Sequence, residues 1–454
     1  MNTEHLVRST SGVRGIIGVS TGLEPTLAAQ YAMAFGTLLG KGKVVLGRDS
    51  RVSGDMVSHA VISGLLATGI DVVEIGIVPT PTVEIAVTGL KAAGGICVTA
   101  SHNPSDWNAL KFFNSRGEFI TPAQYGELSN IFESKGFALK PYSKLGKLSH
   151  QENWIGKHIA LVLALKTVNR PAIKRRKFTV VVDAINGAGS IALPLLLEKL
   201  SVKVIRINCK GDGDFVHMPE PIPKHLTQLA REVKSRKADL GMACDPDADR
   251  LVLVDERGKA INEELTLTVA VRQVLKSKKG KVVLNLSTSR TTEDVARTLG
   301  GDVRYAKVGE ANVVEMMHQV KSIIGGEGNG GVIYPACHAG RDALVGAALI
   351  LSCLAEEKRS LASLVETFPS YYIIKSKAPL PSDFSTRLAR FEAEAEKMLG
   401  AATIDRRDGI RMDFDRGWVQ LRTSNTEPIF RLIVETSDPR LSESLTEQVI
   451  AFFK

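Results

Sequence analysis

Three segments of the chain repeat one order of apolar and polar positions: a short apolar strand that ends in polar residues, an apolar-periodic helix and a second strand. The first segment covers residues 44–75, the second residues 180–207 and the third residues 282–305. Strand–helix–strand units of this kind are typical of α/β domains whose inner strands are mostly parallel. The pattern therefore predicts three α/β domains.

Residues 371–454 follow a different pattern. A charged helical segment near residues 383–399 precedes the turn signal Asp408-Gly409, strands with alternating apolar positions, and a closing helix after Asp438-Pro439. The predicted fold class is therefore α/β: three similar α/β domains with mixed, mostly parallel sheets and a carboxy-terminal α+β domain around a central cleft. We expect domain I at residues 1–150, domain II at 151–253, domain III at 254–370 and domain IV at 371–454.

Composition excludes several classes of protein. The 454 residues are 44% hydrophobic and 24% charged, which argues against a disordered or fibrous chain. The longest nearly uncharged stretch, Ala343–Ala355, is shorter than the about 20 residues of a membrane span, so we expect a buried core helix and no membrane association. Residues 1–10 contain no apolar run, so no secretory signal is visible and the expected location is cytoplasmic.

Cysteine spacing and net charge bear on which kinds of binding site the chain can contain. Five scattered cysteines without a Cys-x-x-Cys pair argue against a disulfide framework and against a zinc site. Lysine and arginine number 58 against 49 aspartates and glutamates, a mild excess that is compatible with a cleft that attracts phosphates. The basic run Lys174–Lys177 has no interleaved aromatic residues, so we expect a solvated connector and no nucleic-acid binding.

The sharpest chemical signal is the segment Asp245-Pro246-Asp247-Ala248-Asp249-Arg250, which lies between two apolar strands. Carboxylates at alternate positions of a tight turn can direct three oxygens at one hard cation such as Mg²⁺. Without a cation the three carboxylates would repel one another, so a polar turn that binds no metal is a poor alternative. The glycine and glutamate of an EF-hand loop are missing, so this is a different kind of metal site.

A second polar cluster, Thr99-Ala100-Ser101-His102-Asn103-Pro104, follows an apolar strand. Ser101 at a strand end could be an exposed nucleophile if a base, a metal or an electrophilic partner assists it, although the same residues can form an ordinary turn. Lys111, which we expect at the head of the next strand, could add a cation to the same cleft.

Three further loops suit ligand binding. The segment Arg422–Pro428 offers a guanidinium, hydroxyl and amide groups, and backbone N–H groups, which together could cradle a phosphate or form a plain hairpin loop. The glycine-rich segment Gly325–Gly331 is not a Walker loop, but its Glu327 and Asn329 could bind hydroxyls. The segment Ser9–Gly15 adds one arginine. Loops donated by four domains to one cleft suit phosphoryl transfer on a sugar phosphate.

Taken together and in order, these motifs resemble those of the α-D-phosphohexomutase family over nearly the whole chain. The matching segments are Thr10-Ser11-Gly12-Val13-Arg14-Gly15, Thr99-Ala100-Ser101-His102-Asn103-Pro104, Asp245-Pro246-Asp247-Ala248-Asp249-Arg250, Gly326-Glu327-Gly328-Asn329-Gly330 and Arg422-Thr423-Ser424-Asn425-Thr426.

The resemblance implies a reaction. Ser101 would carry a phosphoryl group, and Asp245, Asp247 and Asp249 would hold Mg²⁺ together with an oxygen of that phosphoserine. The enzyme would donate the phosphoryl group to a hexose monophosphate, and the 1,6-bisphosphate intermediate would reorient and return its other phosphate to Ser101. Glucosamine or glucose 1,6-bisphosphate is the expected activator. A homodimer is left open as the assembly.

The resemblance also implies roles for the other residues. Arg14 and Lys111 would assist proton transfer and charge balance near the phosphoserine, and which of Arg14, Lys111 and His102 acts as the general base is left open. Arg250 would lie near the phosphoserine. Residues of two loops would bind the substrate: Glu327 and Asn329 at the sugar hydroxyls, and Arg422, Ser424, Asn425 and Thr426 at the non-reacting phosphate. A mobile domain IV would let both substrate orientations fit.

The chain departs from the common pattern in ways that bear on the substrate. The sugar loop usually reads Gly-Glu-x-Ser-Gly-His, whereas Asn329 replaces the serine and Gly331 the histidine, and His338 is a candidate for the missing histidine's role. The usual Gly-Asp-Gly reads Arg341-Asp342-Ala343, and Arg8-Ser9 replaces an opening Phe-Gly. The loop resembles that of phosphoglucosamine mutase-like proteins, which makes glucosamine phosphate the expected substrate.

Three alternatives stay open. Phosphomannomutase/phosphoglucomutase activity is the first, because the metal loop is closer to that branch. A serine-dependent sugar phosphatase would use the same serine and metal but would not need both a sugar-reading and a phosphate-gripping loop. A non-catalytic sugar-phosphate sensor would not need Ser101 and all three aspartates.

Overall fold

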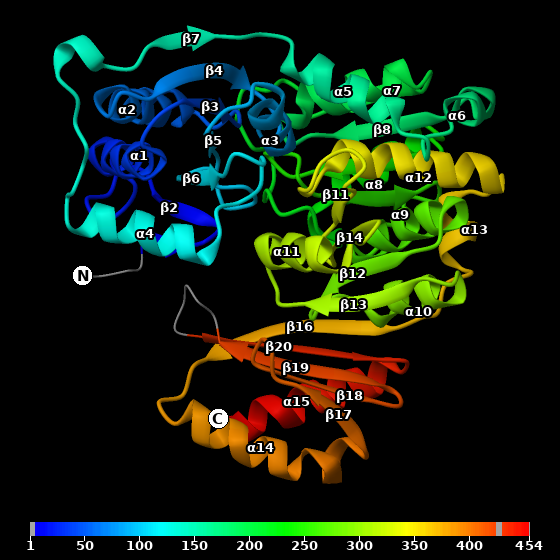
Figure 1. Ribbon diagram of the computed structural model, residues 1–454. Coiled ribbons are helices and arrows are strands. Elements are labelled where there is room, and N and C mark those ends of the chain that lie inside the picture. The colour runs from blue at the N-terminus through cyan, green and yellow to red at the C-terminus, as the bar shows by residue number, and fades with distance from the viewer. Residues whose placement is uncertain (1–4, 424–428, 454) are drawn as a thin grey trace.

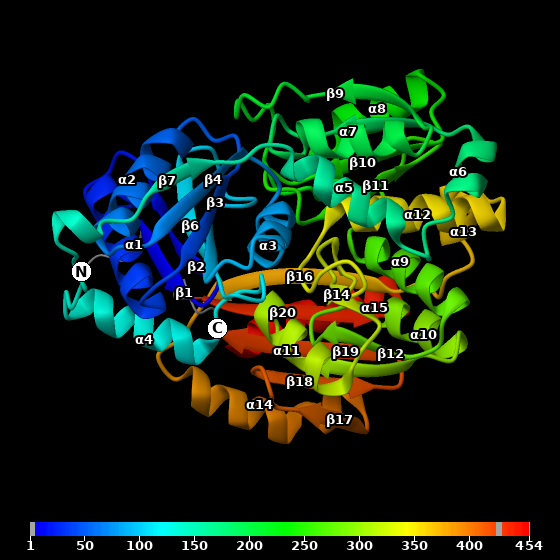
Figure 2. The same ribbon diagram turned by 45° about the horizontal axis from the view of Figure 1, so that its top comes forward.

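The computed structural model describes residues 5–423 and 429–453, which form four domains, each with its own β-sheet (Figure 1). Domain I, drawn blue to cyan in Figure 1, lies beside domain II, and domain IV, drawn orange to red, lies next to domain III. Figure 2 shows the same neighbours from a second direction. The predicted fold class, three α/β domains followed by an α+β domain, is confirmed. The exact boundaries expected from the sequence stay predictions.

Domain I contains a seven-stranded sheet in the order β1-β2-β6-β5-β3-β4-β7. Strands β4, β3 and β5 run parallel, so the carboxyl ends of β3 and β5 lie next to each other, where open α/β sheets bind ligands. The elements are β1 (Leu6–Ser9), β2 (Gly12–Ile16), α1 (Pro25–Leu39), β3 (Lys43–Arg48), α2 (Gly54–Ala67), β4 (Asp71–Ile77), α3 (Thr80–Gly89), β5 (Gly94–Val98), β6 (Trp107–Phe113), α4 (Pro122–Glu133), the 3-10 helix η1 (Tyr142–Lys144) and β7 (Leu148–His150).

Domain II has a four-stranded sheet in the order β11-β10-β8-β9, with β11 antiparallel to the other three. The hairpin between β10 and β11 carries the aspartate-rich loop. The elements are α5 (Trp154–Ala164), α6 (Arg170–Arg176), β8 (Thr179–Asp183), α7 (Gly189–Lys199), β9 (Lys203–Ile207), η2 (Pro223–His225), α8 (Thr227–Ser235), β10 (Leu240–Cys244) and β11 (Leu251–Asp255).

Domain III repeats that arrangement in the order β13-β12-β14-β15, with β15 antiparallel. Its hairpin between β14 and β15 carries the glycine-rich loop. The elements are α9 (Glu264–Ser277), β12 (Lys281–Asn285), α10 (Arg290–Thr298), β13 (Asp302–Ala306), α11 (Glu310–Val320), β14 (Ile324–Glu327), β15 (Gly331–Ile333), α12 (Ala343–Glu357) and α13 (Leu361–Val365).

Domain IV packs two helices against a five-stranded antiparallel sheet in the order β16-β20-β19-β18-β17. A separate apolar core fills the space between sheet and helices. The elements are β16 (Tyr372–Pro379), α14 (Phe384–Leu399), β17 (Ala402–Asp405), β18 (Ile410–Phe414), β19 (Gly417–Thr423), β20 (Ile429–Thr436) and α15 (Pro439–Phe453).

Domains II and III share one continuous apolar core. Helix α12 is buried from Ala343 to Ala355 and contacts helices of both domains, so the prediction of a core helix there is confirmed. Burial on all sides explains its uninterrupted apolar sequence. In the part of the chain that the structure describes, no helix is long and apolar enough to cross a membrane.

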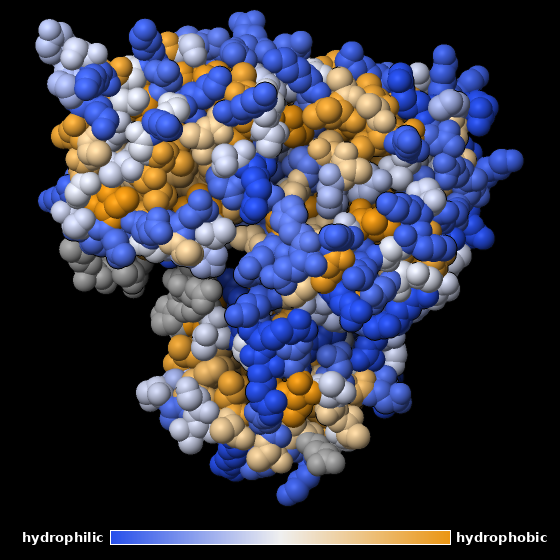
Figure 3. All heavy atoms as spheres, viewed as in Figure 1, coloured by the Kyte–Doolittle hydropathy of each residue, from blue (hydrophilic) through white to orange (hydrophobic). Residues whose placement is uncertain are grey.

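Polar contacts connect domains III and IV. The Arg290 guanidinium donates hydrogen bonds to the carbonyls of Phe414 (3.1 Å) and Gly417 (2.9 Å), and its backbone N–H donates to Glu435 (2.7 Å). Lys375 of β16 donates to the Gly328 carbonyl at 3.3 Å. The surface along this junction is hydrophilic on the face shown in Figure 3.

Most local predictions are confirmed, and two are wrong. The repeated apolar patterns form β3, β8 and β12 with the helices and strands that follow them. Lys111 lies inside β6 rather than at its head, because the strand already pairs with β2 from Trp107. The basic run does not form a connector: Lys174–Arg176 end helix α6, although their side chains are exposed, as expected for a solvated segment.

Candidate active site

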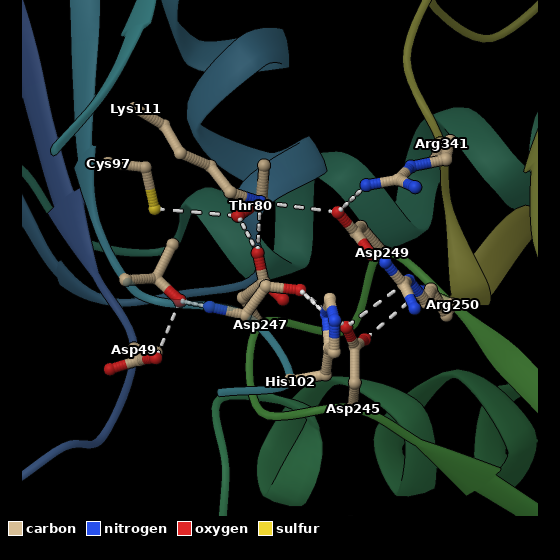
Figure 4. Close-up of polar contacts among 12 residues, drawn as sticks. Asp49, Thr80, Cys97, His102, Lys111, Asp245, Asp247, Asp249, Arg250 and Arg341 are labelled. Carbon is tan, nitrogen blue, oxygen red and sulfur yellow. Dashed lines mark hydrogen bonds and ion pairs between the residues drawn. The ribbon is translucent and has the colours of Figure 1, made fainter. Parts of the chain in front are cut away.

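Predicted site residues of domains I and II converge, together with Arg341 of domain III, where the aspartate loop of the β10–β11 hairpin meets the loop after β5 (Figure 4). The Ser101 hydroxyl donates a hydrogen bond to Asp245 Oδ2 at 2.9 Å. Asp247 accepts a hydrogen bond from Thr80 at the start of α3, at 2.6 Å. Two loops that are far apart in the sequence therefore form one polar surface.

Ser101 occupies a special backbone position. Its φ is +49°, in the left-handed region that few non-glycine residues adopt. The Ser101 N–H donates to the Thr99 hydroxyl at 3.0 Å, and the Thr99 hydroxyl donates to Asp49 at 2.6 Å. These bonds hold the turn that directs the Ser101 hydroxyl toward domain II.

Arg51 fixes the backbone of the loop that carries Ser101, and the sequence did not predict this role. The residue is 2% exposed, and its guanidinium donates to the carbonyls of Ser101 and Asn103, both at 2.7 Å. It also donates to the carbonyl oxygens of Pro104 (2.5 Å) and Trp107 (2.8 Å). The signal that could have revealed it is the polar end of β3, because parallel pairing places that end beside the end of β5.

The three aspartates form a compact acidic group. The carboxylates of Asp245, Asp247 and Asp249 are at most 1% exposed, and one oxygen of each lies within 4.8 Å of the others. Ala248 lets the chain turn between them with a φ of +52°. Burial, together with the charges of Asp249 and Asp247, raises the pKa of Asp245 well above its ordinary value.

Two oxygens of this group fit a metal ion. Asp247 Oδ1 and Asp249 Oδ1 are buried and accept no hydrogen bond from the described residues. Their second oxygens are already occupied, since Lys111 Nζ lies 2.5 Å from Asp247 Oδ2 and Arg341 Nη2 lies 2.7 Å from Asp249 Oδ2. Buried carboxylate oxygens without a hydrogen-bond partner are the kind of ligand that Mg²⁺ prefers. The donor set therefore fits the hard cation that the sequence predicts.

Lys111, Arg250 and Arg341 supply positive charge around the aspartates. Burial alone would lower the pKa of Lys111, but Asp247 and Asp249 raise it above its ordinary value, so Lys111 stays protonated. Arg250 Nε lies 3.9 Å from Asp245 and 3.8 Å from Asp249. The aspartate loop of domain II is thus balanced by cations from all three α/β domains.

His102 and Arg14 flank the serine. His102 Nδ1 lies 3.3 Å from Ser101 Oγ. Burial, followed by the charges of Arg250 and Arg14, lowers the pKa of His102 well below its ordinary value, so its imidazole is neutral near pH 7. Arg14 donates to the Asn103 side chain at 3.2 Å.

The glycine-rich loop places Glu327 in a dense set of donors. Glu327 Oε1 accepts hydrogen bonds from Asn285 (2.8 Å) and from the Gly309 N–H (2.9 Å). Oε2 accepts from Arg341 at 2.8 Å and from Asn329 at 3.4 Å. Since both oxygens already have two donors, a sugar hydroxyl could bind Glu327 only by replacing one of them.

Arg341 was not predicted as a site residue, yet it links the two loops. Besides Glu327 and Asp249, it contacts Glu310 at 3.0 Å. Its stem passes over Gly331, where an added Cβ would lie 2.3 Å from Arg341 Cδ. The arginine therefore fills space that a larger residue at position 331 would occupy. His338, the candidate for the missing histidine's role, instead contacts Glu84 and Asp342.

Part of the predicted phosphate loop can be located. Arg422 lies in β19, and burial lowers its pKa, as does nearby Arg431. Asp408 and Glu327 of the sugar loop oppose that shift, which places Arg422 within electrostatic reach of domain III. Ser424, Asn425 and Thr426 lie outside the described residues.

Comparison with known proteins places the chain among sugar phosphate mutases. Residues 5–139, 158–258 and 262–372 match the phosphoglucomutase/phosphomannomutase alpha/beta/alpha domains I, II and III, and residues 378–452 match the C-terminal domain of the same family. A phosphoglucomutase/phosphomannomutase of Thermococcus kodakarensis is 38% identical and covers 96% of this chain and 96% of its own.

Two further relatives agree with this match. A probable phosphoglucosamine mutase of Methanopyrus kandleri is 36% identical over 97% of this chain and 96% of its own. The X-ray crystal structure of a phosphoglucomutase/phosphomannomutase family protein from Burkholderia thailandensis has a TM-score of 0.84 at 26% identity, and the match covers 98% of this chain and 97% of that one.

Replacing Arg51 by lysine is expected to lower the free energy of unfolding by about 1–3 kcal/mol, because one ammonium group cannot donate hydrogen bonds to all four carbonyls at once. Chemical denaturation measures the change. Arg48→Lys is the matched control: Arg48 pairs with exposed Asp55, so this change is expected to cost less than about 1 kcal/mol. Equal losses in the two variants would contradict the role given to Arg51.

Mg²⁺ is expected to stabilise the protein by about 2.7 kcal/mol at a free concentration about 100 times its Kd. Asp247→Asn replaces a carboxylate that has an unpartnered oxygen by a neutral amide, so the stabilisation by Mg²⁺ should disappear. Thermal unfolding with Mg²⁺ or with a chelator measures the effect. Asp302→Asn, which alters an exposed carboxylate paired with Arg304, should keep the response. A full Mg²⁺ response in Asp247→Asn would argue against a metal at these aspartates.

Proposed function

This chain belongs to the phosphoglucomutase/phosphomannomutase family of phosphohexomutases, and we propose that it exchanges a phosphoryl group with its sugar phosphate substrate through Ser101. The observation that carries this proposal is the hydrogen bond between Ser101 Oγ and Asp245 Oδ2. It puts the only predicted nucleophile directly against the predicted metal loop. Mg²⁺ held by Asp245, Asp247 and Asp249 would neutralise charge on the phosphoryl oxygens.

The proposed reaction begins with a phosphoryl group on Ser101. Transfer breaks the P–Oγ bond and forms a P–O bond to the free hydroxyl of a hexose monophosphate, whose proton passes to a base. The 1,6-bisphosphate then reorients, and a P–O bond to Ser101 Oγ forms as the bond between its other phosphate and the sugar oxygen breaks. The base returns the proton to that sugar oxygen. The net result converts hexose 6-phosphate to hexose 1-phosphate or the reverse, and glucosamine or glucose 1,6-bisphosphate would serve as activator.

Among the three candidates for the base, we favour His102. Its neutral imidazole lies next to Ser101 Oγ and can accept a proton. Lys111 is held protonated by two carboxylates, and Arg14 donates to Asn103, so both suit charge balance better than proton acceptance. Arg250, near Asp245 and Asp249, suits the same purpose.

Binding of the two substrate ends would be divided between domains III and IV. Glu327 and Asn329 would bind the sugar hydroxyls, with the substrate replacing one of the internal donors to Glu327. Arg422, Ser424, Asn425 and Thr426 would bind the phosphate that does not react. The polar junction between domains III and IV supports a domain IV that moves as a unit to admit and enclose the substrate.

We propose glucosamine phosphate as the substrate. Several relatives of similar length are named as probable phosphoglucosamine mutases, although the relative from Thermococcus kodakarensis is named phosphoglucomutase/phosphomannomutase. The glycine-rich loop, which has Asn329 and Gly331 where the common pattern has serine and histidine, supports the same choice. Phosphomannomutase/phosphoglucomutase activity is the alternative.

Turnover of glucosamine 6-phosphate, mannose 1-phosphate and glucose 1-phosphate tests the choice of sugar. With Mg²⁺ and a trace of sugar 1,6-bisphosphate, we expect kcat/KM to be about tenfold or more higher for the glucosamine ester. Preference for the mannose or glucose esters would favour the alternative. Phosphate release faster than isomerisation would instead identify a phosphatase.

Ser101→Ala is expected to abolish turnover while leaving the fold intact, because the variant cannot carry a phosphoryl group. Rates are compared with those of Ser105→Ala, an exposed serine of the same loop that should keep near-normal turnover. Mass spectrometry after incubation with the sugar bisphosphate should find phosphate on Ser101 of the wild type. Normal turnover in Ser101→Ala would refute the proposed reaction, and a wild type that never accepts phosphate would point to a sensor.

A further inference from the structure

A second cluster of chemically active side chains lies at the meeting point of domains I, II and III. His158 comes from α5 of domain II, and His338 and Asp342 precede or cap α12 of domain III. Thr82 and Glu84 of α3 in domain I lie beside them. All five are buried or nearly so, with His158 at 0% and Asp342 at 1% exposure.

Three potential ligand atoms in this cluster lie within 4.8 Å of one another. His158 Nε2 lies 2.8 Å from Asp342 Oδ2, and His338 Nε2 lies 3.0 Å from the same oxygen. The two imidazole rings are nearly perpendicular, at 86°. Tetrahedral Zn²⁺ with bonds of about 2.0–2.1 Å separates its ligand atoms by about 3.4 Å, so only a small outward shift of each group would be needed.

Each ligand also has a polar neighbour on its opposite side. His158 Nδ1 lies 2.9 Å from the Thr82 hydroxyl, and His338 Nδ1 lies 3.2 Å from Glu84 Oε2. Asp342 Oδ1 accepts the N–H groups of Leu344 (2.8 Å) and Val345 (3.2 Å) at the start of α12. In the metal sites of proteins, the second nitrogen of a histidine ligand characteristically contacts a hydroxyl or a carboxylate. Carboxylate ligands in such sites characteristically accept further hydrogen bonds.

We propose that His158, His338 and Asp342 bind a divalent transition-metal ion, with Zn²⁺ as the best match, at the junction of the three α/β domains. Two imidazole nitrogens and one carboxylate oxygen suit Zn²⁺, whereas the oxygen-only aspartate group suits Mg²⁺. The spacing of the cysteines argued against a zinc site, but the ligands here are histidines and an aspartate. This site is separate from the proposed reaction at Ser101.

Zinc binding to the full chain tests the proposal directly. The protein is stripped of metal, Mg²⁺ is added in excess to fill the aspartate group, and Zn²⁺ binding is measured by equilibrium dialysis. We expect about one Zn²⁺ per chain. His158→Gln and His338→Gln should weaken Zn²⁺ binding at least about 100-fold, whereas His150→Gln, which changes an exposed histidine paired with Glu74, should not.

Two further measurements keep the test decisive if a variant fails to fold. X-ray absorption of the zinc-loaded wild type should show scattering from two imidazole rings, and Asp247→Asn should retain the bound Zn²⁺. A wild type that holds no Zn²⁺ in excess Mg²⁺ would overturn the proposal. Oxygen-only ligation, or loss of Zn²⁺ in Asp247→Asn, would overturn it as well, because either result would place the ion at the aspartate group.

Discussion

The repulsion among three buried carboxylates is the constraint on which the rest of this structure depends. Domain II carries all three residues, Asp245, Asp247 and Asp249. The cations that compensate their negative charge come from more than one domain. Lys111 approaches from domain I and Arg341 from domain III. Compensation of these charges therefore requires the domains to meet, and the loops that carry the proposed nucleophile and the sugar contacts are brought together by the same requirement.

The joints between domains differ in physical character. Domains II and III share a continuous apolar core around α12, which resists relative movement because any displacement would open cavities. The joint between domains III and IV consists largely of hydrogen bonds such as those of Arg290, which can exchange with water at little net cost. From this contrast we expect domains II and III to move as one body and domain IV to change its position more easily.

The sequence predicted the fold class and the principal motifs, because polar residues at the ends of apolar strands are visible in a linear pattern. Ser101 and Asp245 were identified in this way, and the structure joins them. Arg51 and Arg341 were missed, since their importance comes from partners that only the folded chain brings near. The start of β6 was misplaced for a similar reason: pairing with β2, rather than local composition, decides where that strand begins.

The contact between Arg341 and Gly331 has a consequence for how such a loop can change over evolutionary time. The arginine stem lies 2.3 Å from where a Cβ at position 331 would sit, and its guanidinium is anchored by Glu327 and Asp249. A histidine at position 331 and this arginine would compete for the same volume. A lineage passing from one loop type to the other would therefore have to lose the arginine before it gains the histidine, so the order of the two steps is set by packing.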